Sequence, residues 1–103
     1  VTIMYEIAVV GSMTNGHDGC SPVPVVEGIP WITIDGIQVT AVGCRCAPHS
    51  CEDHGHHVPI ISDGADFITA DGIRIARVGD PVEWGGCPKG HKIVTGYWLC
   101  VID

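Results

Sequence analysis

The sequence is poor in basic residues. It contains 5 lysines and arginines against 12 aspartates and glutamates, which gives a formal net charge of −7. A surface that binds nucleic acid must face the phosphates with positive charge, and simple adhesion to an anionic membrane has the same requirement. The charge therefore argues against both kinds of partner.

Long apolar runs are also missing. The apolar segment at residues 1–10 is interrupted by Glu6, lacks a preceding basic region and is too short to span a bilayer. We interpret it as a β-strand and regard Met4 as a plausible start of the protein. With no leader or membrane segment in view, we expect a protein that is cytoplasmic until some apparatus exports it.

The chain shows no helical stripe of apolar residues. Its β-branched runs are separated by glycine and proline, a pattern that favours strands and turns. With 103 residues, 14 of them glycine and only 6% aromatic, one small domain of this kind has a marginal core. Disulfides, a metal or a partner often stabilise such folds. The 6 cysteines and 6 histidines offer the first two.

A repeated segment organises the chain. Residues 32–43 and 68–79 are identical at seven of twelve positions, and each copy reads as a strand, an Asp-Gly turn and a second strand. A seven-residue spacing from glycine to aspartate occurs at Gly28 and Asp35, at Gly64 and Asp71, and at Gly96 and Asp103. We predict a single domain of three units, approximately 11–42, 43–78 and 79–103. The middle unit is enlarged and the last stops at its turn.

Units of this length must pack on one another to bury their apolar faces, and three are about the minimum. We therefore predict an all-β domain in which three hairpin repeats form a closed arrangement with pseudo-threefold symmetry. In unit one, strands are expected at 25–26, 31–34 and 37–42. Units two and three should place their strands within 59–78 and 93–102.

Cysteine and histidine concentrate in three polar segments, residues 11–24, 43–58 and 79–92, which we interpret as matching loops. Loops at equivalent positions of a threefold arrangement converge at one end. The candidate ligands there are His17, Cys20, His49, Cys51, His54, His56, His57, Cys87 and His91. Mixed imidazole and thiolate ligands suit a tetrahedral Zn²⁺ site that contributes folding free energy directly, and Fe²⁺ also suits a histidine-rich site. The sequence predicts a structural metal, with the choice among these ligands open.

A disulfide framework is the first competing interpretation. The number of cysteines is even, and Cys44, Cys46 and Cys51 lie close enough in sequence to pair with one another or with Cys100. The chain would then be a disulfide-stapled secreted binding module. A reducing cytoplasm disfavours this interpretation, and Cys100 matches apolar positions of the other units, which favours a buried thiol there.

A small metal-dependent hydrolase is the second competing interpretation. It needs an open coordination position and a general base, for which Glu52, Asp53 and Asp18 are candidates. Acidic residues beside glycines in loops are usually solvated turn formers. We therefore expect no enzymatic activity.

Residues 72–80, Gly-Ile-Arg-Ile-Ala-Arg-Val-Gly-Asp, resemble the signature of PAAR-repeat proteins. In that family a hairpin glycine is followed by Pro-Ala-Ala-Arg and then by Val-Gly-Asp. Residues 76–80 match, whereas Arg74 and Ile75 replace the proline and the first alanine. The resemblance covers nearly the whole chain, from about Ile7 to Asp103, because it lies in the repeat architecture as well as in this motif.

The resemblance implies a small β cone with a pseudo-threefold base and a zinc ion near its vertex. Three histidines and one cysteine hold the metal in that family. Carried over to this chain, these ligands are His17, His54, Cys87 and His91. His56 and His57 are alternates for the middle loop, and Cys20 is an alternate for His17.

The resemblance also implies a structural function. PAAR-repeat proteins cap and sharpen the trimeric β-helical spike of a contractile injection apparatus, which is the VgrG protein of a type VI secretion system or the central spike of a contractile phage tail. We expect one copy per spike trimer, effector proteins as further partners, and transient contact with the target membrane during piercing. Export would follow assembly into the apparatus or the phage tail tip. Tyr5, Trp98 and Ile102 are candidates for the apolar surface that contacts the spike.

Overall fold

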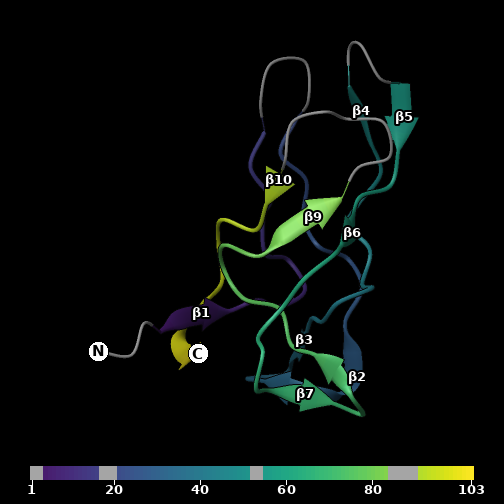
Figure 1. Cartoon of the computed structure of the whole chain (residues 1–103). Coiled ribbons are helices and arrows are strands. Elements are labelled where there is room, and N and C mark those ends of the chain that lie inside the picture. The colour runs from purple at the N-terminus through teal and green to yellow at the C-terminus, as the bar shows by residue number, and fades with distance from the viewer. Residues whose placement is uncertain (1–3, 17–20, 52–54, 84–90) are drawn as a thin grey trace.

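The structure, a computed structural model, describes residues 4–16, 21–51, 55–83 and 91–103 (Figure 1). Within these residues every regular element is a β-strand, which confirms the predicted all-β class. The strands in chain order are β1 (Tyr5–Ile7), β2 (Ile29–Ile34), β3 (Ile37–Val39), β4 (His49–Cys51), β5 (Gly55–His57), β6 (Ile60–Ile61), β7 (Thr69–Ala70), β8 (Ile73–Arg74), β9 (Pro81–Glu83), β10 (His91–Lys92) and β11 (Tyr97–Ile102). The same described segments contain no helix long and apolar enough to cross a bilayer.

Two Asp-Gly hairpins form where the sequence predicts them. β2 pairs antiparallel with β3, and β7 pairs antiparallel with β8. Asp35 and Gly36 have φ angles of 50° and 80°, and Asp71 and Gly72 have φ angles of 51° and 81°. Positive φ at both central residues gives a turn whose twist matches the flanking strands. Aspartate and glycine tolerate this conformation better than most residues do.

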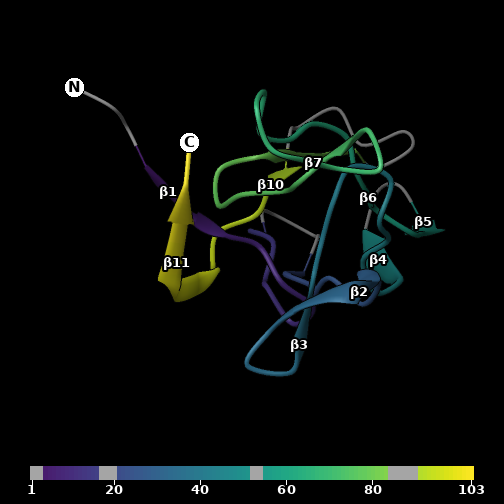
Figure 2. The same ribbon diagram turned by 90° about the horizontal axis from the view of Figure 1, so that it is seen from below.

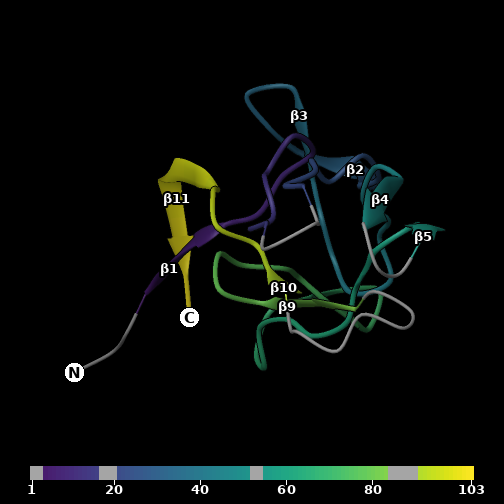
Figure 3. The same cartoon turned by 90° about the horizontal axis from the view of Figure 1, so that it is seen from above.

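A further two-stranded sheet joins segments from opposite ends of the sequence. β11 pairs antiparallel with β1, and Ile102 lies opposite Tyr5 just as Ile34 lies opposite Ile37 in the first hairpin. β1 therefore stands to β11 as β3 stands to β2. Figure 2 shows the β1–β11 pair, the β2–β3 hairpin and β7 on different sides of the molecule, and Figure 3 gives the opposite view of the β1–β11 pair.

The three regularly spaced glycines make the same kind of contact. A Cβ atom added at Gly28 would lie 2.8 Å from Cβ of Gln38, one at Gly64 would lie 2.6 Å from the carbonyl oxygen of Ile75, and one at Gly96 would lie 2.7 Å from the carbonyl oxygen of Ile7. Each glycine thus packs against the strand β3, the segment that continues β8, or β1. Only a residue without a side chain allows this close approach, and this explains the glycine spacing in the sequence.

A closed ring of backbone hydrogen bonds lies at the centre of the fold. Ala8 N–H donates to the carbonyl of Ala76 at 3.0 Å, Ala76 N–H donates to Thr40 at 3.0 Å, and Thr40 N–H donates to Ala8 at 3.1 Å. All three residues are fully buried, with 0% exposure. Because each segment both donates to and accepts from a neighbour, the ring fixes the three segments relative to one another.

The same relation extends outward along the three segments. Val10 N–H donates to Gln38, Val42 N–H donates to Arg74, and Val78 N–H donates to Glu6, over 2.9, 3.0 and 2.9 Å. Gly11, Gly43 and Gly79 follow these valines, and all three have positive φ, between 92° and 99°. They then donate to the carbonyls of Val25, Ile61 and Ile93. Contacts between distant segments, more than side-chain bulk, hold this small fold together.

The core consists of small and β-branched residues. Among the described residues no Trp, Tyr or Phe is buried, and the largest fully buried side chains include Ile61, Ile93, Val25 and Val39. The chain extends over 38 × 32 × 23 Å. A core of this kind buries little apolar area per residue, in line with the marginal core expected from the composition.

Several element boundaries differ from the sequence prediction. Residues 25–26 form only an isolated bridge, at Val25, and β2 begins at Ile29 rather than at residue 31. The segment 79–92, expected to be a loop, contains β9 and β10, which pair with each other.

Of the strand expected over residues 1–10, the described part is a strand only at Tyr5–Ile7. The strand expected at 37–42 ends at Val39. Beyond Val39 the chain takes part in the central ring at Thr40 and turns at Gly43. Ala41 and Val42 are therefore apolar because they pack into the fold and not because the strand continues.

Candidate metal centre and docking face

Three of the four predicted metal ligands, His17, His54 and Cys87, lie outside the described residues, as does the alternate Cys20. His91 is the fourth, and it begins β10. β4 and β5 lie at one end of the molecule, β2, β3 and β7 lie at the other, and β9 and β10 lie between them (Figure 1). Among the described residues no three His, Cys, Asp or Glu side chains gather in a way that could hold a metal ion.

The surroundings of His91 suit a metal ligand. Its side chain is buried, and its Nδ1 lies 3.2 Å from the carbonyl oxygen of Asn15. A carbonyl only accepts, so Nδ1 carries the proton and a neutral ring has its unprotonated nitrogen at Nε2. Metal-binding histidines commonly donate the other ring nitrogen in this way, which fixes the tautomer and the ring orientation.

Asn15 is itself held in place by backbone and side-chain contacts. Its N–H donates to the carbonyl of Lys92 at 3.0 Å, and its Oδ1 accepts from the N–H of Lys92 at 2.8 Å. The residue that orients His91 is thus fixed from two sides. The donor chemistry of His91 therefore fits the zinc site that the resemblance implies.

Four of the middle segment's candidates, His49, Cys51, His56 and His57, lie on paired strands. Residues 43–58 were expected to form a loop, but they contain β4 and β5, paired with His49 opposite His57 and Cys51 opposite Gly55. The prediction of a loop is wrong for these residues, because pairing between the two short strands satisfies their backbone groups. His56 lies on β5 between Gly55 and His57.

Three cysteines of the described residues are free thiols. Cys44 and Cys46 are buried and Cys100 is half-buried, so none of the three is in a disulfide. Burial, together with repulsion from a thiolate at Cys44, raises the pKa of Cys46 to about 11. Burial also raises the pKa of Cys44. A hydrogen bond from the backbone of Ala41 has the opposite effect, but burial is the larger of the two. These thiols act as small apolar core residues.

The raised thiol pKa values predict a loss of stability at alkaline pH. Between the ordinary value of 9.0 and about 11 for Cys46, the unfolded chain releases a proton that the folded chain retains. The contribution of Cys46 to the free energy of unfolding is therefore fully present below pH 9. It is lost as the pH rises toward 11, and the loss is roughly 2 to 3 kcal/mol. Urea unfolding at several pH values should show this fall. In Cys46→Ala the free energy of unfolding should decrease less steeply between pH 9 and 11. An equally steep decrease in the two proteins would contradict the raised pKa of Cys46.

Large apolar side chains are exposed at corresponding places on the hairpins. Trp31, Phe67 and Leu99, which we call the apolar set, each lie three residues after one of the spaced glycines, and their exposures are 68%, 87% and 62%. Tyr5, Ile37 and Ile73 begin β1, β3 and β8, and they are exposed as well. Scattered apolar surface residues need no explanation, but a repeated pattern of them is typical of an interaction site.

The predicted contact residues have different exposures. Tyr5 is exposed and Trp98 is 70% exposed, whereas Ile102 is buried against the core. Sequence reasoning did not single out Trp31, Phe67 or Leu99. Their shared distance from Gly28, Gly64 and Gly96 is a signal that could have identified them.

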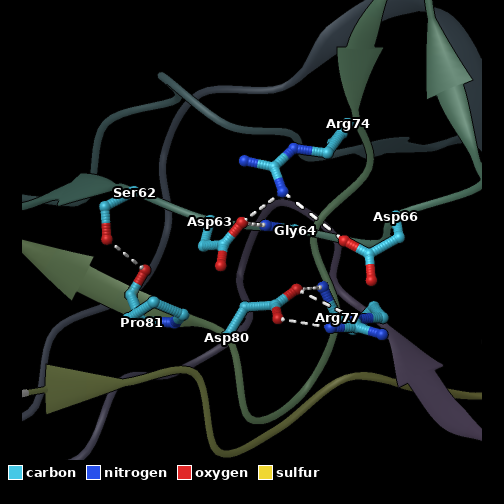
Figure 4. A network of polar contacts seen from close by, with 8 residues as sticks. All are labelled: Ser62, Asp63, Gly64, Asp66, Arg74, Arg77, Asp80 and Pro81. Atoms are coloured by element: carbon cyan, nitrogen blue, oxygen red, sulfur yellow. Dashed lines mark hydrogen bonds and ion pairs between the residues drawn. The ribbon is translucent and has the colours of Figure 1, made fainter.

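The Arg-Val-Gly-Asp segment at residues 77–80 has a structural role in this chain. Asp80 accepts from the backbone N–H of Arg77 at 2.6 Å and binds its guanidinium at 3.0 Å (Figure 4). Ser12 caps the corresponding turn, where its Oγ accepts from Val9 N–H at 3.0 Å. The hydrogen bond to Asp80 raises the pKa of Arg77, and the guanidinium lies 4.8 Å from the centre of the Tyr5 ring.

Further polar contacts join the hairpins to their surroundings. Arg74 lies 2.5 Å from Asp63 and 3.7 Å from Asp66, all three partly exposed (Figure 4). Tyr97 donates its hydroxyl to Asp35 at the first turn, and this hydrogen bond raises the pKa of Tyr97. Exposed ion pairs contribute little to stability, so these contacts orient the hairpins more than they stabilise them.

A cavity of about 240 Å³ opens beside the middle unit, lined by Val26, Glu27, Arg45, Cys46, Pro48 and Val58. Its charged side chains, Glu27 and Arg45, form an ion pair with each other at 3.0 Å. The volume is below that of most sites for drug-sized ligands. The candidate bases of the hydrolase interpretation, Asp18, Glu52 and Asp53, lie outside the described residues.

Comparison with models of known protein families finds no match to this chain, and comparison with curated proteins finds no related sequence.

Proposed function

We propose that this chain is a structural, non-enzymatic tip protein of the PAAR-repeat kind. It caps the trimeric β-helical spike of a contractile injection apparatus, either VgrG-like or the central spike of a phage tail. Three units related by pseudo-threefold symmetry form its body, and a zinc ion, or Fe²⁺, lies near its vertex. One copy sits on each spike trimer.

The observation that carries this proposal is the threefold recurrence of the backbone contacts. The central ring passes through Ala8, Thr40 and Ala76, and each member donates to the next over 3.0 to 3.1 Å. A trimeric partner presents the same surface three times around its axis. A single chain can match that surface only if it repeats its own contact positions around an axis.

The apolar set supplies such positions. Trp31, Phe67 and Leu99 differ in size but share exposure and place in the repeat. Large aromatic and aliphatic side chains are the residues that anchor protein interfaces. Tyr5 lies on β1, which pairs with the strand that carries Trp98 and Leu99, so we place it and the exposed Trp98 in the proposed docking face, with Ile102 supporting it from the core.

The opposite end of the molecule is the proposed point. His17, His54, Cys87 and His91 would hold the metal there, and the metal would supply a tetrahedral cross-link between three segments of the chain. His91 is buried and oriented by Asn15, as a ligand should be before the metal arrives. A metal cross-link suits a point that must stay rigid although the core behind it is small.

The proposed life cycle follows from this role. The protein is cytoplasmic before assembly, travels with the spike, and contacts the target membrane only during piercing. Effector proteins are further candidate partners. The net charge of −7 is consistent with a contact that is transient rather than adhesive.

Replacing the apolar set tests the docking proposal. The variant Trp31→Ser, Phe67→Ser, Leu99→Ser should bind the trimeric β-helical spike protein from the same cell at least about 100-fold more weakly, because a loss of about 1 kcal/mol at each of three interface residues sums to about 3 kcal/mol. The binding is measured by biolayer interferometry on the immobilised spike. The matched control replaces three apolar residues that are also exposed but lie off the hairpins, Val26, Val58 and Val94, by serine. Equal losses in both variants would sink the proposed face.

A further inference from the structure

β11 and β1 pair like the two strands of each Asp-Gly hairpin, and we call this pair the third hairpin. Its second strand, β1, comes from the beginning of the sequence. In the first two hairpins a two-residue turn, Asp35-Gly36 or Asp71-Gly72, ties the second strand to the first. In the third, β11 is followed by Asp103, and the partner strand β1 is preceded by Met4. Asp103 and Met4 therefore occupy the places that aspartate and glycine occupy in the other turns.

The contacts of β1 match those of its two counterparts. Val78 N–H donates to Glu6 on β1 at 2.9 Å, as Val10 donates to Gln38 on β3 at 2.9 Å and Val42 donates to Arg74 on β8 at 3.0 Å. The three isolated bridges that continue these strands also correspond, namely Ile7 with Arg77, Val39 with Val9, and Ile75 with Ala41. The backbone hydrogen bonds of β1 with the rest of the fold therefore match those of β3 and β8.

The covalent connection is what differs. β3 and β8 are each held by a short turn, so little chain entropy opposes their pairing. β1 is joined to β11 only through most of the chain, and closing a long loop costs more entropy than closing a short one. Segments that lack a local tie also open with the smallest free energy.

We infer that residues 4–7 form a latch that opens and recloses while the β2–β3 and β7–β8 hairpins stay intact. The latch is held by its pairing with β11, by its contact with Gly96, and by the Arg77 guanidinium over the Tyr5 ring. Opening it uncovers Gly96 and the neighbouring edge of β11. The inference needs no assumption about the partner or the metal, and its test uses the protein alone.

Hydrogen exchange of three valine amides tests the latch. Val10, Val42 and Val78 are all half-buried and bonded over nearly equal distances, but only Val78 donates to the latch. Measured by NMR and corrected for intrinsic exchange rates, the protection of Val78 should be about tenfold lower than that of Val42. Equal protection, or stronger protection of Val78, would overturn the inference.

A circular permutant tests the turn assignment. Asp103 is joined directly to position 4 in the variant Met4→Gly, residues 1–3 are omitted, and the chain is opened between Asp71 and Gly72. The new Asp-Gly turn should make the third hairpin covalent, so the least protected amide should move from Val78 to Val42. A permutant that does not fold, or that keeps Val78 as the least protected amide, would contradict the assignment.

Alanine at the glycine under the latch gives a second test in the unpermuted chain. Gly96→Ala places a Cβ 2.7 Å from the Ile7 carbonyl, and Gly64→Ala places one 2.6 Å from the Ile75 carbonyl. The Cβ at position 96 would also lie 2.7 Å from Cγ2 of Val78, so the free energy of unfolding is measured rather than the exchange of Val78. If the latch can move, Gly96→Ala should lower the free energy of unfolding by less than Gly64→Ala does, because β1 can shift whereas β8 is held by its turn. Equal losses in the two variants would show that β1 is no more independent than β8.

Discussion

Cys87→Ser is expected to release the proposed metal ion and to abolish cooperative thermal unfolding. A structural zinc site contributes on the order of 10 kcal/mol in small zinc-binding peptides at neutral pH, and this chain has a core of small residues that cannot replace such a contribution. Metal content is measured by inductively coupled plasma mass spectrometry of the purified protein. Unfolding is followed by circular dichroism.

Cys100→Ser is the matched control for that experiment. It makes the same chemical change at a half-buried free thiol on β11, away from the proposed metal ligands in the sequence. We expect this variant to retain about one metal ion per chain, with a loss of roughly 1 kcal/mol from the altered packing. Metal loss in both variants, or a wild-type protein purified without zinc or iron, would contradict the proposed centre.

Gly64→Ala is expected to lower the free energy of unfolding by about 3 kcal/mol, at the upper end of the usual cost of overpacking. The new Cβ would lie 2.6 Å from the carbonyl oxygen of Ile75 and 3.2 Å from that of Arg74, so backbone rather than a flexible side chain would have to move. Urea denaturation gives the loss directly. The thermal midpoint should fall by roughly 12 to 24 °C in a domain of this size.

Gly72→Ala separates crowding from backbone conformation. Gly72 has a φ of 81°, but a Cβ there would meet nothing within 4 Å. The cost should be only about 1 to 2 kcal/mol, which is the price of the left-handed conformation for a residue with a Cβ. A larger loss for Gly72→Ala than for Gly64→Ala would show that the close glycine contacts do not hold the fold together.

Local sequence signals predicted the local structure well. Asp35-Gly36 and Asp71-Gly72 force two-residue turns, so both hairpins could be predicted without knowledge of the rest of the chain. The pairing of β1 with β11 could not be predicted in this way. No turn motif joins the two strands, which lie at opposite ends of the sequence. Their register, with Tyr5 opposite Ile102, becomes apparent only in the structure.

The site was predictable only in outline. The placement of cysteine and histidine between the strands suggested a metal, but the burial of His91 and its contact with Asn15 depend on segments far apart in sequence. The β4–β5 hairpin was missed because its strands contain histidine, serine, cysteine and glycine rather than β-branched residues. The apolar set was missed because Trp31, Phe67 and Leu99 share a position and not an identity.

The most direct test of the account is the stoichiometry of the complex with the spike. The purified protein is mixed in excess with the trimeric β-helical spike protein from the same cell, and the complex is weighed by native mass spectrometry. We predict one chain of this protein, carrying one metal ion, on each spike trimer. Three chains per trimer, or no complex at all, would contradict the proposal that a single chain with three matching units caps the spike.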